Sequence, residues 1–216
     1  DDLYFGGAKD QTGALFVQQT NGRFTQTGAR AFAPDSTSED VGAAFLDANG
    51  DRHLDLFVAS GGNEFSEMAT ALQDRLYLND GRGQFRKADG SVPVEGSSGS
   101  RIAAADYDGD GDVDVFIGGR VVPWRYGADP QSLLLRNDGA GRFTDVTAEL
   151  APELARVGMV TDAAWRDVDG DSRADLIAVG EWMPITVFRN AGGGRLTRVA
   201  APSLEHSTGW WNRIVA

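Results

Sequence analysis

The stretch that decides the fold reads Asp106-Tyr-Asp-Gly-Asp-Gly-Asp-Val-Asp114, and the apolar run Val115-Phe-Ile-Gly118 follows it directly. Two other segments repeat this pattern with the same kind of apolar run behind them. Their first residues are Asp47, Asp106 and Asp167, so the steps are 59 and 61 residues. A period of about sixty residues indicates a repeat architecture. The two further copies are Asp47-Ala-Asn-Gly-Asp-Arg-His-Leu-Asp55 and Asp167-Val-Asp-Gly-Asp-Ser-Arg-Ala-Asp175.

A second motif repeats in phase with the first, over 76–85, 133–143 and 187–196. In each copy a short β-rich run meets an Asn-Asp-Gly or Gly-rich turn and returns through an aromatic residue or Leu, which is typical of a β-hairpin. The acidic motif is also a hairpin, with strands expected at 102–105 and 113–118. Two hairpins per repeat give four short antiparallel strands, the unit of a β-propeller blade. The sequence therefore predicts an all-β fold built of four-stranded blades.

The chain holds about four blade equivalents in one propeller domain over 1–216. Whole blades are expected at about 41–90, 100–148 and 160–200. The segment 1–30 matches the last three strands of a blade, and 212–216 matches the first strand at 101–104. Three arrangements stay open: part of a ring of seven or eight blades, a four-bladed ring closed on itself, or a ring built from two chains.

Composition fits this interpretation. Glycine accounts for 28 of 216 residues, about twice the usual share, and this favours many tight turns between short strands. The net charge of −12 is unfavourable for nucleic acid and for anionic lipid, and it favours cations. The absence of cysteine excludes disulfides and thiolate metal sites. No apolar run is long enough to span a membrane.

The acidic loops have the ligand spacing of a calcium site. Calcium binds six to eight oxygens, and a tight loop can offer them at alternate positions. Counting the first aspartate as position 1, side-chain ligands stand at positions 1, 3, 5 and 9, and position 7 contributes a backbone carbonyl. A glycine at position 4 of each loop allows the turn. The predicted metal residues are Asp47, Asn49, Asp51, His53 and Asp55; Asp106, Asp108, Asp110, Asp112 and Asp114; and Asp167, Asp169, Asp171, Arg173 and Asp175.

Other calcium motifs fit poorly. An EF-hand needs Glu at position 12, where this chain has Val58, Ile117 and Ala178. A calcium-binding β-helix repeats every nine residues rather than sixty. Three Ca²⁺ sites are expected, and a fourth, completed at the chain ends by Asp2, stays open. Asn49 removes one charge from the first loop and is expected to weaken it.

These loops, together with Phe5-Gly-Gly-Ala8 and Ile117-Gly-Gly119, resemble the FG-GAP (VCBS-type) repeat family, which also supplies the propeller of integrin α subunits. The segments Gly180-Glu-Trp-Met-Pro-Ile185 and Gly209-Trp-Trp-Asn212 resemble secreted bacterial members related to cartilage acidic protein. The resemblance implies a secreted or cell-surface protein with a binding or adhesion role.

The sequence predicts no enzyme. The chain has only His53 and His206, and it has no nucleophile elbow, zinc-protease motif or P-loop. The clustered carboxylates are committed to metal. The expected ligand surface is the face opposite the acidic loops, where connectors carry aromatic and polar side chains typical of interaction sites. Its candidate residues are Asn63, Glu64, Trp124, Arg125, Tyr126, Glu181 and Trp182.

Three function classes follow. The first is a calcium-dependent recognition or adhesion module for a protein or glycan. The second is a polysaccharide lyase or hydrolase whose catalytic domain is the propeller. The third is a structural unit that associates with itself or with other propeller segments. The first is preferred, with an extracellular location, because occupied loops of modest affinity need millimolar calcium.

Overall fold

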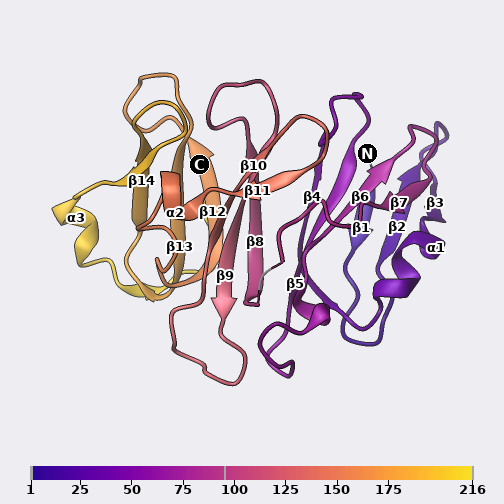
Figure 1. The fold of residues 1–216 in the computed structure, drawn as a ribbon, viewed down its shortest axis with the longest axis horizontal. Coiled ribbons are helices and arrows are strands. Elements are labelled where there is room, and N and C mark those ends of the chain that lie inside the picture. The colour runs from indigo at the N-terminus through magenta and orange to yellow at the C-terminus, as the bar shows by residue number, and fades with distance from the viewer. Residues whose placement is uncertain (1, 95, 216) are drawn as a thin grey trace.

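A computed structural model describes residues 2–94 and 96–215. The chain folds into antiparallel sheets that stand side by side in a row (Figure 1). We call them blade 1 to blade 4 in chain order. The strands of blade 1 are β1 (Leu3–Phe5), β2 (Ala14–Gln18) and β3 (Phe24–Thr27); those of blade 2 are β4 (Glu39–Leu46), β5 (Asp55–Gly61), β6 (Arg75–Asn79) and β7 (Phe85–Lys87). Blade 3 has β8 (Ser98–Ala105), β9 (Asp114–Val121), β10 (Leu133–Asn137) and β11 (Phe143–Asp145); blade 4 has β12 (Met159–Arg166), β13 (Asp175–Met183), β14 (Thr186–Asn190) and β15 (Leu196–Arg198), with β16 (Gly209–Trp210) added.

The predicted all-β propeller fold is confirmed. Each complete blade runs in the order first, second, third and fourth strand, and blade 1 has three strands, as expected from its sequence. Helical segments are short connectors. They are α1 (Ala29–Phe32), η1 (Ala33–Asp35), η2 (Thr70–Leu72), α2 (Thr147–Leu150) and α3 (Pro202–Glu205). No helix in the described part of the chain has the length and apolar character needed to cross a membrane.

The second strand of each complete blade is buried on both faces. In β5, Leu56 and Val58 pack into a cluster shared with blade 1, whereas Phe57 and Ala59 pack into a cluster shared with blade 3. Successive side chains on a strand point to opposite faces, so one uninterrupted apolar run fills two interfaces. A third cluster, which includes Phe116 and Phe188, joins blades 3 and 4. The hydrophobic core is therefore divided into layers between blades.

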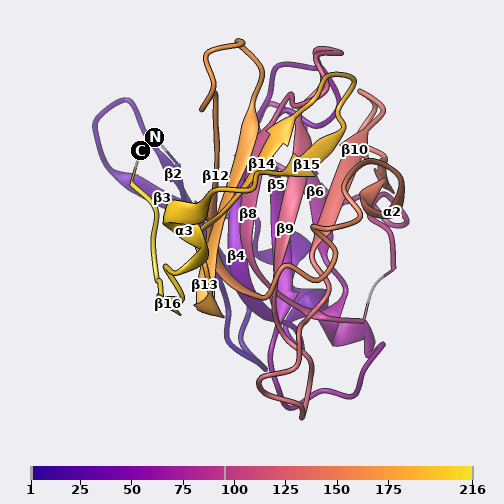
Figure 2. The same ribbon diagram turned by 90° about the vertical axis from the view of Figure 1, so that its left-hand side faces the viewer.

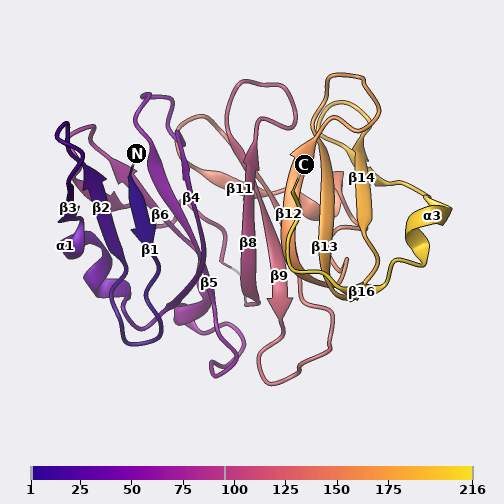
Figure 3. The same cartoon turned by 180° about the vertical axis from the view of Figure 1, so that it is seen from behind.

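The row of blades is open. Blades 1 and 4 lie at its two ends in Figure 1 and again from behind in Figure 3. Figure 2 looks along the row, with blade 4 in front of the others. Within the described residues, none of the three core clusters joins blade 1 to blade 4. The four-bladed ring closed on itself, one of the arrangements left open by the sequence, is therefore not the arrangement of this chain.

The end of the chain differs from its prediction. A final strand was expected at 212–216, but residues 211–215 form no strand, and residue 216 lies outside the described residues. The last strand is β16, which runs antiparallel to the end of β13 and pairs Trp210 with Glu181. In β4, β8 and β12 the first strand of a blade is held by its second strand across an acidic loop. The tail has no such partner within the described residues, which explains why it does not form a strand.

The tail nevertheless lies where a following blade would begin. The Thr161 hydroxyl of β12 donates to the carbonyl oxygen of Trp211 at 2.5 Å. An equivalent bond joins blades 3 and 4. There the Ser100 hydroxyl of β8 donates to the carbonyl oxygen of Val160 in β12 at 2.7 Å. The backbone nitrogen of Ile214 also donates to Asp162 at 2.8 Å. The position of the tail is thus set by contacts that repeat from blade to blade.

Candidate metal centres

The acidic loops connect the first and second strands of blades 2, 3 and 4. All three lie along the upper edge in Figure 1, and the loops after the second strands lie along the lower edge. This arrangement follows from topology, because in an antiparallel sheet alternate connections lie at opposite edges. We call residues 47–55, 106–114 and 167–175 the first, second and third loop.

The backbone of each loop is fixed by its own side chains. In the second loop, one oxygen of Asp106 accepts the backbone N–H of Gly109 at 2.8 Å, and the other accepts that of Gly111 at 3.0 Å. Asp108 accepts from the amide of Asp110, and Asp110 from that of Asp112. The third loop repeats all four bonds. Short carboxylates that bond nearby amides thus hold the turn before any metal is considered.

Glycine at position 4 has the backbone conformation predicted for it. The φ angles of Gly50, Gly109 and Gly170 are 73°, 84° and 82°. Position 6 also has a left-handed backbone, which sequence reasoning missed. There the second loop has Gly111, but the first and third loops place Arg52 and Ser172 at φ 68°. A non-glycine residue with positive φ is uncommon and carries a conformational cost.

The aspartate at position 9 anchors the blade. Asp55, Asp114 and Asp175 are fully buried. In the second loop, one oxygen of Asp114 accepts the backbone N–H of Tyr107 at 3.4 Å, and the other accepts that of Asn137 at 2.8 Å. Equivalent bonds hold Asp55 and Asp175. Each carboxylate therefore ties the acidic loop to the second hairpin of its own blade.

Two of the loops gather three carboxylates each. Asp106, Asp108 and Asp114 offer one oxygen apiece, all within 4.8 Å of one another, and Asp167, Asp169 and Asp175 do the same in the third loop. These are positions 1, 3 and 9, three of the four predicted side-chain ligands. Position 5, occupied by Asp110 and Asp171, is outside both groups. The two groups are acidic clusters that could hold a metal ion.

The first loop differs because position 3 is Asn49. At positions 1, 3 and 9 the other loops have three carboxylates, whereas the first loop has two, Asp47 and Asp55. The Asn49 side-chain amide donates to Asp51 at 3.0 Å, and the backbone N–H of His53 donates to Asp51 at 2.8 Å. One oxygen of Asp47 is buried without a hydrogen-bond partner in the described structure. A buried, unpaired carboxylate oxygen is costly, and a cation would satisfy it.

The electrostatics favour a cation in the second loop. Burial, with Asp108 and Asp110 nearby, raises the pKa of Asp114 to about 7. Burial also raises the pKa of Asp108, with Asp110 and Asp106 adding to the effect. Crowded carboxylates resist ionisation, and a bound cation reverses that preference. The donor set consists of hard oxygens, which suits calcium or magnesium rather than a soft metal.

Position 7 shows three different side chains at one backbone position. The imidazole Nδ1 of His53 lies 3.1 Å from Asp51. Arg173 pairs with Asp171 and donates from Nε to the carbonyl oxygen of Asn190 at 2.9 Å. In the second loop, the backbone N–H of Asp112 donates to Asp110 at 2.9 Å. Arg173 therefore partly neutralises position 5 in the third loop, and His53 contacts position 5 in the first.

Asp2 reproduces position 9 for blade 1. One of its oxygens accepts the backbone N–H of Gln18 at 3.0 Å, in the way that Asp55 accepts from Asn79. Among the described residues, Asp2 is not part of a group of three acidic ligands. The tail at 211–215 lies at the other end of the row, against β12. Within the described part of the chain, the two ends therefore do not assemble a fourth site.

Sequence reasoning missed the asparagine in the second hairpin. Asn79, Asn137 and Asn190 each donate their backbone N–H to the position 9 aspartate of their own blade. The side-chain amides of Asn137 and Asn190 also reach back to the preceding loop, where they donate to the carbonyl oxygens of Ala48 at 2.9 Å and Tyr107 at 2.6 Å. The signal was available, since asparagine stands at the end of the third strand in all three hairpins.

The predicted ligand-face residues lie at the edge opposite the loops. Asn63 accepts the backbone N–H of Trp124 at 2.8 Å and so joins blades 2 and 3. Arg125 pairs with Glu67 at 2.7 Å. The Glu64 carboxylate accepts the N–H of Asn63 at 3.0 Å. Two more predicted residues form a cluster at blades 3 and 4, where the Tyr126 hydroxyl donates to Glu181 at 2.5 Å, and Trp182 packs against the Tyr126 ring.

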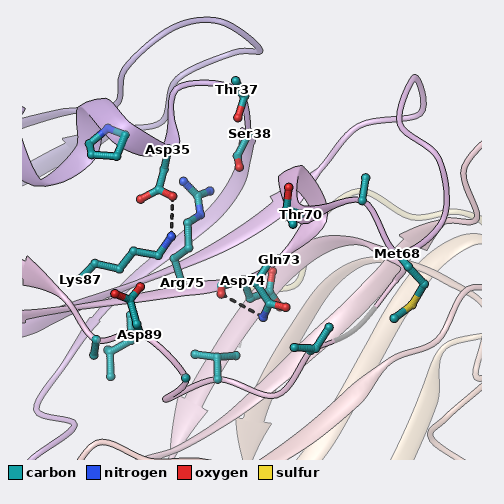
Figure 4. Close-up of a pocket in the computed structure, with 17 residues that line it drawn as sticks. Asp35, Thr37, Ser38, Met68, Thr70, Gln73, Asp74, Arg75, Lys87 and Asp89 are labelled. Atoms are coloured by element: carbon teal, nitrogen blue, oxygen red, sulfur yellow. Dashed lines mark hydrogen bonds and ion pairs between the residues drawn. The ribbon is translucent and has the colours of Figure 1, made fainter.

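A cavity of about 400 Å³ lies beside blade 2, in a place that sequence reasoning did not identify (Figure 4). Lys87 pairs with Asp35 at 2.5 Å within it. Arg75 is buried and pairs with Asp40 at 2.6 Å. Asp40 also accepts the Tyr4 hydroxyl at 2.8 Å. This buried charge network fastens blade 1 to blade 2, and the cavity walls combine it with apolar side chains.

The chain is similar in sequence to known proteins. A family model for the FG-GAP-like repeat matches residues 47–117 and 167–216, which include all three acidic loops. Cartilage acidic protein 1 of Mus musculus is 29% identical over 187 residues, 83% of this chain and 27% of the mouse protein. The chain thus spans about a quarter of that relative.

One solved structure, of an Agrocybe aegerita lectin that specifically recognises non-reducing terminal N-acetylglucosamine, is similar with a TM-score of 0.52 at 16% identity. The alignment covers 91% of this chain and 50% of the lectin chain, and at this identity it concerns the fold alone. The family match covers more than half of the sequence and coincides with the repeated loops of blades 2, 3 and 4. This chain belongs to the FG-GAP-like repeat family.

Proposed function

We propose that the chain is a calcium-binding propeller module that acts outside the cell and recognises a protein or glycan. The observation that carries the proposal is the pair of carboxylate groups at positions 1, 3 and 9, with oxygens within 4.8 Å of one another. The family relationship and the relative named for cartilage support an extracellular setting. The lectin fold supports recognition of a partner, glycans included.

The residues suited to hold calcium are Asp106, Asp108 and Asp114 in the second loop, and their counterparts in the third. Calcium prefers six to eight oxygen ligands, and magnesium keeps more of its water. Bound calcium would relieve the repulsion between these carboxylates and stabilise the hairpin that they close. Because the ligands converge only in the folded blade, calcium binding contributes to folding.

The proposal places metal binding and recognition at different edges. The acidic loops lie along one edge of the blades, and the connectors after the second strands lie along the other (Figure 1). Trp124, Tyr126 and Trp182, which are exposed, come from these connectors or from the strand end beside them. Calcium therefore has a structural role, since it holds the hairpins whose opposite ends present the recognition residues. Extracellular modules of this type have dissociation constants on the order of 10⁻⁴ to 10⁻³ M.

Calcium titration tests the proposal. The metal-free chain is melted in EGTA, in CaCl₂ and in MgCl₂, and binding is measured by calorimetry. At 100 times the dissociation constant, one site adds about 2.7 kcal/mol, or roughly 5–10 °C in a protein of this size. Asp108→Asn should reduce the shift. Glu149→Gln, which removes an exposed charge from the same blade, should leave it unchanged. An equal response to magnesium, or none to calcium, would contradict the proposal.

A further inference from the structure

Three exposed aromatic rings from separate segments meet at the edge opposite the acidic loops. Tyr126 comes from the loop after β9, Trp182 from the end of β13 and Trp210 from β16. The Tyr126 and Trp182 ring centroids are 5.4 Å apart at 70°, and those of Trp182 and Trp210 are 5.8 Å apart at 66°. Their exposed fractions are 56%, 51% and 63%. We call these three residues the aromatic platform.

The platform joins blades 3 and 4, but its rings are not buried between them. Aromatic residues that do pack between blades are buried, as shown by Tyr107 and Trp165, whose rings stack at 5.6 Å and 10° with exposures of 2% and 8%. The platform rings touch one another but keep half or more of their surface in water. Contiguous exposed aromatic surface of this kind marks an interaction site.

The platform is also held in place. Trp182 has a left-handed backbone, with φ 55°, which is rare for a bulky residue. Such conformations persist where the surrounding structure fixes them, and they concentrate at functional sites. Here the backbone pairing of β13 with β16 spans this point, joining Glu181 to Trp210 and Met183 to Gly209.

A fixed carboxylate lies beside the rings. Glu181 accepts from Arg120 Nη2 at 2.6 Å through one oxygen and from the Tyr126 hydroxyl at 2.5 Å through the other. The hydrogen bond from Tyr126 lowers the pKa of Glu181 most, and the bond from Arg120 lowers it further. The carboxyl group is therefore ionised at neutral pH. A carboxylate has about four lone-pair sites. Two are left by these bonds, and the Glu181 side chain keeps 10% of its surface exposed, where a ligand hydroxyl can reach it.

The geometry points to the aromatic platform as a carbohydrate-binding subsite, in which pyranose rings stack on Tyr126, Trp182 and Trp210 while Glu181 accepts their hydroxyl groups. This assignment rests on the proposed recognition function and gives it a site and a ligand class. A sugar ring presents an apolar C–H face to an aromatic side chain and hydroxyl donors at its rim, which matches rings beside an acceptor.

Other ligand classes fit less well. Nucleic acid would bring phosphates to a carboxylate on a chain of net charge −12. A proline-rich peptide also binds exposed aromatics, but it presents carbonyl acceptors and few N–H donors. Glu181 is acceptor-only when ionised and would have little to bond there.

The test is a titration of the calcium-loaded chain with a panel of neutral and N-acetylated di- to tetrasaccharides, with a proline-rich peptide for comparison. Binding is read by calorimetry and tryptophan fluorescence. Trp182→Ala and Trp210→Ala should each weaken the saccharide that binds best at least tenfold. Phe24→Ala is the control, since Phe24 is also an exposed aromatic residue, at 44%, but lies in β3 of blade 1, away from the platform. It should change affinity less than twofold.

The calcium-dependent melting shift of each variant separates this inference from the proposed function. Saccharide binding that survives Trp182→Ala and Trp210→Ala overturns the site but leaves glycan recognition standing. If the chain binds the peptide but no saccharide, and Trp182→Ala abolishes peptide binding, the platform is a binding site but its assignment to carbohydrate is wrong. A chain that responds to calcium but binds no saccharide also overturns the inference, whereas loss of the calcium response contradicts the proposed function itself.

Discussion

The first and second acidic loops share a backbone and differ in chemistry. In both, the position 1 aspartate accepts the N–H of position 6, at 2.8 Å in the first loop and 3.0 Å in the second. In both, position 9 is buried and bonded to the second hairpin. Only the second loop brings three carboxylates together, because the first has Asn49 where the second has Asp108. The loop conformation is therefore encoded separately from its charge.

The difference extends to neighbouring groups. Asp51 of the first loop is engaged by the Asn49 amide and by His53. Within the described residues, no acidic side chain of the second loop takes part in an ion pair. The second loop thus carries uncompensated negative charge, and the first is partly satisfied by its own side chains. Three predictions test how far this comparison holds.

The largest effect is expected where the loops agree. Asp114→Ala removes the acceptor of two backbone N–H groups, and leaving them unpaired should lower the unfolding free energy by about 3 kcal/mol or more. The loss should appear without calcium, in urea denaturation of the metal-free chain. Asp55→Ala should give a similar loss. Asp110→Ala, at an exposed position of the second loop, is the control and should cost less than about 1 kcal/mol. Equal losses for Asp114 and Asp110 would refute the anchoring role of position 9.

A smaller effect is expected where the loops differ in charge. Asn49→Asp gives the first loop the ligand set of the second and should tighten its calcium binding roughly tenfold, or about 1.4 kcal/mol. Calorimetry would be done with Asp106→Asn and Asp167→Asn present, so that only the first loop binds. The same variant should be slightly less stable without metal, since it loses the amide bond to Asp51. Unchanged affinity would show that position 3 does not separate the two loops.

The smallest effect concerns the backbone at position 6. Arg52→Gly should stabilise the first loop by about 0.5 kcal/mol, because glycine adopts positive φ without steric cost but loses more entropy on folding. Gly111→Ala should destabilise the second loop by about 1 kcal/mol. Both are read from thermal melts in EGTA. A stabilising Gly111→Ala would mean that position 6 is not held in the left-handed conformation in solution.

The sequence predicted the features that are determined by residues within one hairpin or loop. The hairpins, their turns and the positive φ of Gly109 follow from residue spacing and turn chemistry within a few positions. The placement of all three loops at one edge follows from strand alternation. The clustering of Asp106, Asp108 and Asp114 also follows, since all three lie in one nine-residue turn.

Features that depend on neighbouring blades were not predicted. The side chain of Asn137 was assigned only to a turn, yet its amide bonds the preceding blade, and spacing within one repeat does not contain that partner. The tail was predicted as a strand from its likeness to 101–104, but strand formation needs a partner that the likeness does not supply. Each of these outcomes was decided by contacts between repeats.

The asparagine bonds to the preceding loop have a consequence for how such a protein gains and loses stability. The Asn137 amide donates to the carbonyl oxygen of Ala48, and the Asn190 amide to that of Tyr107. The junctions between blades 2 and 3 and between blades 3 and 4 are therefore each made twice, once by apolar packing and once by this polar link. A single repeat taken alone would expose an unpaired amide on one side and an unpaired carbonyl on the other. Stability in such a chain is a sum of nearest-neighbour terms. Unfolding should therefore begin at the two ends of the row and proceed inwards, one junction at a time.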